Sequence, residues 1–265
     1  MDAPRTNPIK VLLAGESWVA SGSHIKGSDV FDQPRYEEGG VELVHALSAA
    51  GIGVTRVPAH LVSRDFPASL AGLAEYDVVI VSDVGADSFE LTDDCLSGRR
   101  SVSRLRVLAE WVADGGALLM IGGYMSFSGI QGRAGFARSR LAGVLPVAML
   151  DHDDRVERPD GVEPLVVDSS HPIVARLPSS WPFLLGYNEV RPREGSTVLV
   201  TVDESPLLVV GSHGRGRAAA FSSDCAPHWA SHDFLAWPHY ADVFGRLVGW
   251  LAGASVLDQS PPPKL

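Results

Sequence analysis

The chain has 265 residues, of which 45% are hydrophobic and 20% charged, and it carries a formal net charge of -10 with a pI near 5.3. Nucleic acids and anionic membrane surfaces are bound by an excess of Lys and Arg, so this acidic balance argues against both as partners. The first apolar run is far shorter than the ~20 residues of a membrane-spanning helix, and two cysteines, Cys95 and Cys225, are too few for a disulfide framework. We therefore expect a soluble cytoplasmic protein with a small-molecule ligand.

Short apolar runs bounded by glycine and polar residues predict a doubly wound α/β fold in the first half of the chain. The predicted strands lie at 10–14, 53–57, 77–81 and 117–121, and the predicted helices at 40–50, 70–75 and 103–114. The connection from Glu16 to Glu38 is much longer than a simple strand-to-helix loop, which takes about two to six residues. We expect this connection to be a functional lid.

The second half of the chain changes character. Short extended runs separated by Pro, Gly, Asp and Ser predict an added β-rich, antiparallel segment at about 145–205. A hairpin follows, with strands at 206–211 and 217–221, and then a last helix at about 237–251. No internal repeat or Pro/Ser-rich linker interrupts the chain. We expect residues 1–255 to form a single domain and residues 256–265 to form a frayed C-terminal tail.

Four of the predicted strands end in clusters of polar or glycine residues. These clusters are Gly15–Trp18, Ser82–Gly85, Gly122–Ser126 and Ser222–Trp229. Short apolar runs of this kind indicate strands buried on both faces, as in parallel sheets, and ligands of such sheets bind outside the carboxyl ends of the strands. We therefore expect the four clusters to converge on one crevice.

The densest group of reactive side chains is Asp224, Cys225 and His228. Asp224 or His228 is a candidate general base, and Cys225 is a candidate nucleophile that His228 would activate. In the alternative interpretation, Cys225 is a small buried apolar residue and Asp224 caps a turn. A third interpretation adds His232 and makes this segment a tetrahedral zinc site. Because no second Cys or His pair is present, we expect no metal and no cofactor.

Two further residues are candidates for catalysis. Glu16, at the end of the first strand, is a candidate acid or base beside Asp224, and its alternative role is an ion pair or a helix-cap contact. Tyr124 is a candidate hydrogen-bond donor to a substrate oxygen, and its alternative role is to plug the pocket. The candidate substrate-binding residues are Ser17, His24, Lys26, Asp83, Gly123, Ser126 and Asn188. For the two basic residues, the alternative is a solvated loop.

Several motifs carry a resemblance to a known family. They are Gly15–Trp18, His24–Gly27, Tyr36–Gly40, Gly122–Phe127, His171–Ile173, Gly186–Asn188 and the stretch from Gly214 to Trp229. With them the chain resembles, over nearly its whole length, the class I glutamine amidotransferase-like superfamily, and specifically the "putative glutamine amidotransferase" branch related to ThuA-like proteins. The resemblance implies a flavodoxin-like three-layer α/β/α sandwich.

The chain departs from this superfamily at the catalytic turn. The amidotransferases carry a cysteine nucleophile on a sharp Gly-x-Cys-x-Gly turn, where this chain has Tyr124, and their late His-Pro-Glu is replaced here by Ser222–Cys225. A phenol with a pKa near ~10 cannot form the thioester that glutamine hydrolysis requires. We expect a small-molecule hydrolase or related enzyme that is not a glutaminase, and the ThuA-like resemblance implies carbohydrate-related substrates. The alternative is a catalytically silent binding or oligomerisation module, and a homo-oligomer stays open under either interpretation.

Overall fold

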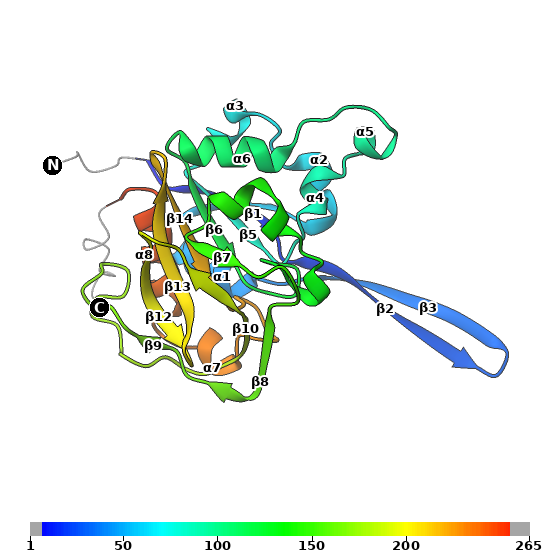
Figure 1. The fold of residues 1–265 in the computed structure, drawn as a ribbon. Helices are drawn as coiled ribbons and strands as arrows, with labels where there is room; N and C mark the ends of the chain where they lie inside the picture. The colour runs from blue at the N-terminus through cyan, green and yellow to red at the C-terminus, as the bar shows by residue number, and fades with distance from the viewer. Residues whose placement is uncertain (1–6, 255–265) are drawn as a thin grey trace.

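The computed structural model describes residues 7–254, and the expected tail at 256–265 lies outside them. Its central sheet has the strand order β4-β1-β5-β6-β14-β13-β12-β9 (Figure 1). The parallel strands are β1 (Lys10–Gly15), β4 (Gly53–Val57), β5 (Val78–Ser82), β6 (Ala117–Ile121) and β14 (Gly216–Phe221). Numbered by appearance, these five strands have the 2-1-3-4-5 order of flavodoxin-like sheets. The predicted fold class is therefore confirmed.

Helices cover both faces of this sheet. One face carries α1 (Val41–Ala49) and α8 (Tyr240–Leu251), and the other carries α2 (Val62–Asp65), α3 (Leu70–Leu73), α4 (Asp87–Glu90) and α6 (Arg104–Ala113). Successive strand side chains point to opposite faces, so Leu13 packs in one core and Leu12 in the other. In the described part of the chain, no helix combines the length and apolar character needed to cross a membrane.

The second half adds the expected β-rich segment. The strands β13 (Ser205–His213), β12 (Thr197–Val202) and β9 (Leu165–Val166) extend the main sheet in antiparallel fashion. Two antiparallel pairs stand beside the sheet: β8 (Arg155–Val162) with β10 (Leu184–Asn188), and β7 (Val147–Met149) with β11 (Val190–Pro192). The sequence did not predict the short helices α2 and α4, and it also did not predict α5 (Asp93–Leu96), α7 (His232–Leu235), η1 (Ala59–Leu61), η2 (Ile130–Gly132), η3 (Phe136–Arg138) and η4 (Arg140–Gly143).

Residues 17–38, here called the arm, form a hairpin instead of the expected lid. Its strands, β2 (Ser17–Lys26) and β3 (Asp29–Glu38), pair along their whole length and project away from the body (Figure 1). Gly27, with φ +65°, supplies the left-handed conformation that the tight turn between them needs. Many polar residues interrupt the apolar alternation of these strands, so no clear strand pattern marks them in the sequence. Apart from Ser17, every residue in the two strands is exposed.

Candidate functional site

The carboxyl ends of four neighbouring strands lie side by side. Gly15 of β1 is in register with Ser82 of β5, Ser82 with Ile121 of β6, and Ile121 with Phe221 of β14. The four polar clusters that follow these strands therefore begin at one edge of the sheet. This is the edge at which the sequence predicted a site.

Unusual backbone conformations gather at this edge. Glu16, Asp83 and His228 have φ values of 50°, 43° and 124°, although none of them is glycine. Such conformations cost on the order of 1–3 kcal/mol each and tend to occur at functional sites. Neighbouring glycines also make room for Glu16, because a Cβ built on Gly39 would stand 2.6 Å from its Oε2. The local chain is thus shaped around the Glu16 carboxyl.

Glu16, Ser82, Asp83, Asp224 and Cys225 form what we call the inner group. Glu16 is 1% exposed, and its Oε1 accepts hydrogen bonds from the Ser82 hydroxyl and from the Cys225 thiol, whose Sγ lies 3.7 Å away. Asp224 is 7% exposed and accepts a 2.9 Å hydrogen bond from the backbone N–H of Ala226. Two acidic side chains are therefore buried close together.

Burial and like charge determine the protonation of the inner group. Burial, followed by the charge of Asp83, raises the pKa of Glu16 to about 7. Burial and the charges of Glu16 and Asp83 likewise raise the pKa of Asp224, and burial raises that of Asp83. The inner group therefore holds a proton near neutral pH. Burial also raises the pKa of the Cys225 thiol, which supports its interpretation as a small buried apolar residue.

Tyr124 lies on the sharp turn after β6, whose backbone is held by side chains of the protein itself. Asp83 Oδ1 accepts a 2.7 Å hydrogen bond from the N–H of Met125, and Asn188 Oδ1 accepts a 3.0 Å bond from the N–H of Gly123. Ser126 joins this framework, because its Oγ accepts a 3.0 Å bond from the N–H of Asp83. Two amides of the turn are thereby engaged within the protein rather than directed at a substrate.

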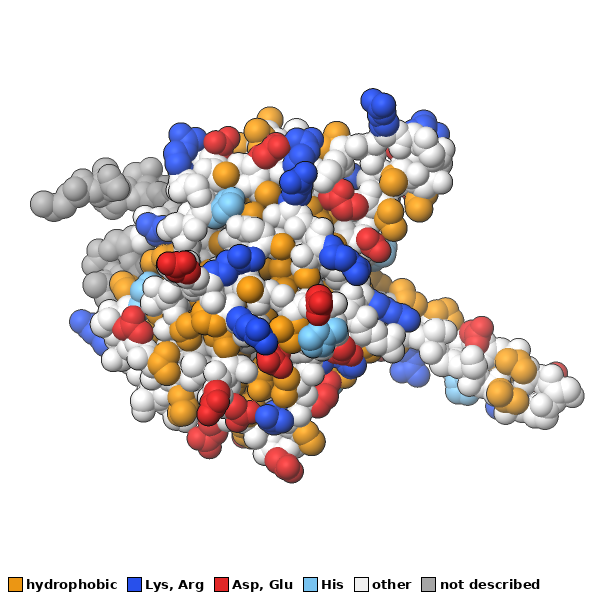
Figure 2. Space-filling view, in the orientation of Figure 1, with side chains coloured by type: hydrophobic (Ala, Val, Ile, Leu, Met, Phe, Trp, Pro, Cys, Tyr) orange, Lys and Arg blue, Asp and Glu red, His pale blue; other side chains and the backbone are white. Residues whose placement is uncertain are grey.

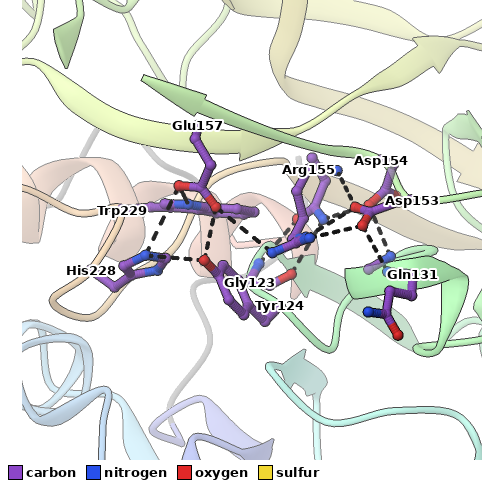
Figure 3. Close-up of polar contacts among 11 residues, drawn as sticks. Gly123, Tyr124, Gln131, Asp153, Asp154, Arg155, Glu157, His228 and Trp229 are labelled. Atoms are coloured by element: carbon purple, nitrogen blue, oxygen red, sulfur yellow. Dashed lines mark hydrogen bonds and ion pairs between the residues drawn. The ribbon is translucent and has the colours of Figure 1, made fainter. Parts of the chain in front are cut away.

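Tyr124, Arg155, Glu157, His228 and Trp229 form an outer group (Figure 3). The two Glu157 oxygens accept hydrogen bonds from the Tyr124 hydroxyl at 2.9 Å and from Trp229 Nε1 at 3.0 Å. His228 Nε2 lies 3.4 Å from the Tyr124 hydroxyl, and the Arg155 guanidinium lies 4.7 Å from the centre of the Tyr124 ring. Burial and Glu157 together raise the pKa of Tyr124. Unlike the inner group, the outer group is partly open to solvent.

The structure distributes the predicted site residues over several places. The inner group contains Glu16, Asp83, Asp224 and Cys225, the outer group contains Tyr124 and His228, and the turn framework contains Gly123, Ser126 and Asn188. Ser17 is a structural residue at the base of the arm, where its Oγ accepts a hydrogen bond from the N–H of Ala59.

His24 and Lys26 do not join either group within this chain. Both lie near the exposed end of the arm, where the His24 ring stacks on Phe31 with 5.0 Å between the centroids. The expectation that they stand over the crevice of their own chain is therefore not met, because the arm projects away from the body (Figure 1).

Sequence reasoning missed three polar contributors: Ser82, Arg155 and Glu157. Ser82 is the last residue of β5 and belongs to one of the four polar clusters, so the sequence pattern already marked its position. Arg155 and Glu157 come from β8, in the β-rich segment, where no motif marked them. Their role depends on a strand pairing that the sequence does not specify.

One group of potential metal ligands occurs within residues 7–254. Ligand atoms of Glu16, Asp224 and Cys225 all lie within 4.8 Å of one another. The structure does not bring the candidate zinc ligands together, because His228 belongs to the outer group and the exposed His232 begins α7. A metal at the inner group would require the Cys225 thiolate, whose formation burial and the neighbouring carboxylates oppose.

The fold and the polar edge of its sheet define a class I glutamine amidotransferase-like protein. The family described as "Putative glutamine amidotransferase" matches residues 10–253, and the chain belongs to this family. No curated protein matches the chain.

Several solved structures are similar to the chain. A cytoplasmic protein from Salmonella typhimurium is 40% identical with a TM-score of 0.89, covering 92% of this chain and 99% of its own. A second cytoplasmic protein, from Salmonella typhimurium LT2, is 42% identical with a TM-score of 0.88 and the same coverages. A ThuA-like protein from Parabacteroides merdae shares the fold at 15% identity, with a TM-score of 0.59 and coverages of 97% and 94%.

Proposed function

We propose that this protein is a small-molecule hydrolase or related enzyme in which Glu16 and Asp224 perform acid–base chemistry. The observation that carries the proposal is the buried Glu16 carboxyl, whose pKa is raised to about 7 beside a second buried carboxyl. A carboxyl that is half protonated near neutral pH can both donate and accept a proton. One member of the pair then serves as the acid while the other serves as the base.

Glutamine hydrolysis does not fit this site. Tyr124 occupies the turn where the amidotransferases carry their nucleophile, and Cys225 is fully buried with a raised pKa. The N–H of Met125, which lies on the same turn, already donates to Asp83. A thioester would therefore have neither a thiolate nor a free oxyanion-binding turn.

The outer group supports a polar, hydroxyl-rich substrate. The Glu157 carboxylate and the Tyr124 hydroxyl oxygen, whose proton is donated to Glu157, offer acceptors, while Arg155 and His228 offer donors at the partly exposed rim. This set matches the carbohydrate-linked substrate that the ThuA-like resemblance implies. We further propose that residues 1–255 act as one domain in the cytoplasm, as the Salmonella proteins are described as cytoplasmic.

The proposal is tested by turnover of defined probes. The wild-type protein is assayed on panels of 4-nitrophenyl glycosides and 4-nitrophenyl esters, and ammonia release is followed with L-glutamine. We expect turnover of at least one chromogenic probe, no ammonia from glutamine, and a loss of about 100-fold or more in kcat for Glu16→Gln. Glu194→Gln is the matched control, because this exposed carboxylate lies in the turn before β12 and belongs to neither group.

Two outcomes would contradict the acid–base role. Turnover unchanged in Glu16→Gln would remove Glu16 from the chemistry, and ammonia release abolished by Cys225→Ala would restore the glutaminase interpretation. If no probe is turned over, the silent binding or oligomerisation module becomes the preferred function. The engagement of turn amides by Asp83 and Asn188 is the observation that favours this second candidate.

A further inference from the structure

The arm carries apolar side chains that the rest of the described chain, residues 7–254, leaves largely exposed. Trp18, Val19, Ile25, Val30, Phe31 and Tyr36 are 40–73% exposed. Figure 2 shows hydrophobic side chains along the arm, both near its base and near its end. A two-stranded hairpin that stands alone in water is marginally stable at best. An arm of this length is therefore expected to rest on a partner.

The two edges of the arm differ in their ability to pair with another strand. The N–H of Gly39 donates to the Glu16 carbonyl, so these two residues form a hydrogen-bonded pair. Along the antiparallel ladder that follows, hydrogen-bonded pairs alternate with pairs whose backbone groups point away from the partner strand. By this alternation, the backbone groups of Val19, Ser21, Ser23 and Ile25 point to the outer edge of β2. Between Ser17 and Ile25 this edge carries no proline and no Lys, Arg, Asp or Glu side chain.

The outer edge of β3 is obstructed in the way that natural sheets protect their edges. Pro34 lies opposite Ser21, at a position whose backbone nitrogen points to the outer edge of β3. Because proline has no N–H, this edge lacks a hydrogen-bond donor there. Asp32, Arg35 and Glu37 add charge along the same strand. An incoming strand would therefore pair with β2 and not with β3.

We propose that the arm is a dimerisation element, in which β2 pairs with β2 of a second copy of this chain. A two-fold axis brings identical strands together in antiparallel orientation. Because only odd-numbered residues of β2 point outward, the longest symmetric register is centred on Ser21 and pairs residues 17–25 of both copies. The result is a four-stranded sheet in which Trp18 lies opposite the partner's His24.

Charge and size favour a second copy as the occupant. Antiparallel pairing brings the end of one arm, with His24 and Lys26, to the base of the other, where Glu37 and Glu38 lie in a chain of net charge -10. A strand of ten residues extends about 33 Å. Two such arms, each ending on the opposite body, offer contact on the scale of the ~800 Å² per partner of standard interfaces. This dimer does not depend on the proposed function.

Light scattering coupled to gel filtration tests whether the dimer forms through the edge of β2 or through that of β3. The wild-type protein is expected at twice the 28.2 kDa of the chain. Ser21→Pro removes an outward N–H from β2 and should yield the monomer, whereas the matched Asp32→Pro on β3 should leave the dimer intact. A monomeric wild type, a dimeric Ser21→Pro variant, or a monomeric but folded Asp32→Pro variant would each overturn the proposal.

Disulfide trapping tests the register without weakening the arm. In a Cys95→Ser background, which removes the exposed native thiol, Ser21→Cys places two thiols across the two-fold axis and should form a covalent dimer on oxidation. Ser23→Cys is equally exposed on the same edge but faces the partner's Val19, so it should stay uncrosslinked. Failure of Ser21→Cys to crosslink, or crosslinking of both variants alike, would overturn the β2 pairing.

Discussion

Two regions of this protein bury carboxylates, and the two kinds of buried carboxylate differ in their hydrogen-bond partners. Asp154 is 2% exposed, and its oxygens accept 2.8 Å hydrogen bonds from the N–H groups of Ser128 and Gly129 and from Asn188 Nδ2. Glu16 is as deeply buried, but it accepts only from a hydroxyl and a thiol and faces the acidic Asp83 and Asp224. The Asp154 carboxylate thus has three N–H donors, whereas the Glu16 carboxyl has a hydroxyl and a thiol donor together with two acidic neighbours.

This difference separates a structural carboxylate from a candidate catalytic one. Burial raises the pKa in both regions, but the donors around Asp154 oppose the rise, whereas neighbouring carboxylates add to it at Asp224. Removing a well-bonded carboxylate should therefore cost stability, while neutralising an unfavourably placed one should not. Natural proteins commonly accept such unfavourable charge where function requires it.

The largest effect is expected at Asp154. Asp154→Ala leaves two buried backbone N–H groups and the Asn188 amide without their hydrogen-bond acceptor. We therefore expect a loss of about 3–5 kcal/mol in the free energy of unfolding. Urea denaturation at neutral pH measures this loss. Asp153→Ala is the control, because Asp153 is partly exposed and pairs with Arg155, and it should cost about 1 kcal/mol or less. Equal losses for the two variants would contradict the structural role of Asp154.

The parallel half of the fold was predictable because its strands are short apolar runs with clear ends. The strand Gly53–Val57 was predicted with the bounds of β4, and the polar clusters marked the edge of the sheet at which the candidate site lies. The arm was missed because its strands are solvated on both faces, so no apolar run or strict alternation marks them. Burial patterns reveal only those elements that pack against a core.

The site was predictable only as far as it follows strand ends. Glu16, Asp83 and Asp224 follow β1, β5 and β14, and the topology alone brings them together. No local motif marks Asp154 as a buried carboxylate, and none marks Glu157. Their positions depend on the pairing of β8 with β10, which brings Asn188 opposite Arg155. Long-range pairings of this kind leave little trace in local sequence.

An intermediate effect, with the opposite sign, is expected at Glu16. Its pKa rises from 4.5 to about 7 on folding, so the folded state binds a proton more tightly than the unfolded state. The stability that Glu16 contributes is then fully present below pH ~4.5, declines as the pH rises, and is lost above pH ~7. Glu16→Gln lacks this penalty and should be more stable than wild type at pH 8 by about 2–3 kcal/mol.

Chemical denaturation from pH 4 to 8 measures this effect. The difference between Glu16→Gln and wild type should increase across that interval and level off at its alkaline end. Glu194→Gln, at an exposed position in the turn before β12, is a control that should show no such trend. A pH-independent difference would mean that Glu16 titrates normally, and the acid–base proposal would lose its main support.

The smallest change in stability is expected at Asp224, where it distinguishes a catalytic residue from a turn cap. Asn keeps the oxygen that accepts from the N–H of Ala226, so Asp224→Asn should stay within about 1 kcal/mol of wild type at pH 7. Since it also removes a charge facing Glu16, the melting temperature should be unchanged or higher. Turnover of the chromogenic probes should nevertheless fall, because the Glu16 carboxyl loses the partner with which it shares a proton. A clearly lower melting temperature with turnover intact would instead assign Asp224 to the architecture of the turn, and the inner group would then lack its acid–base pair.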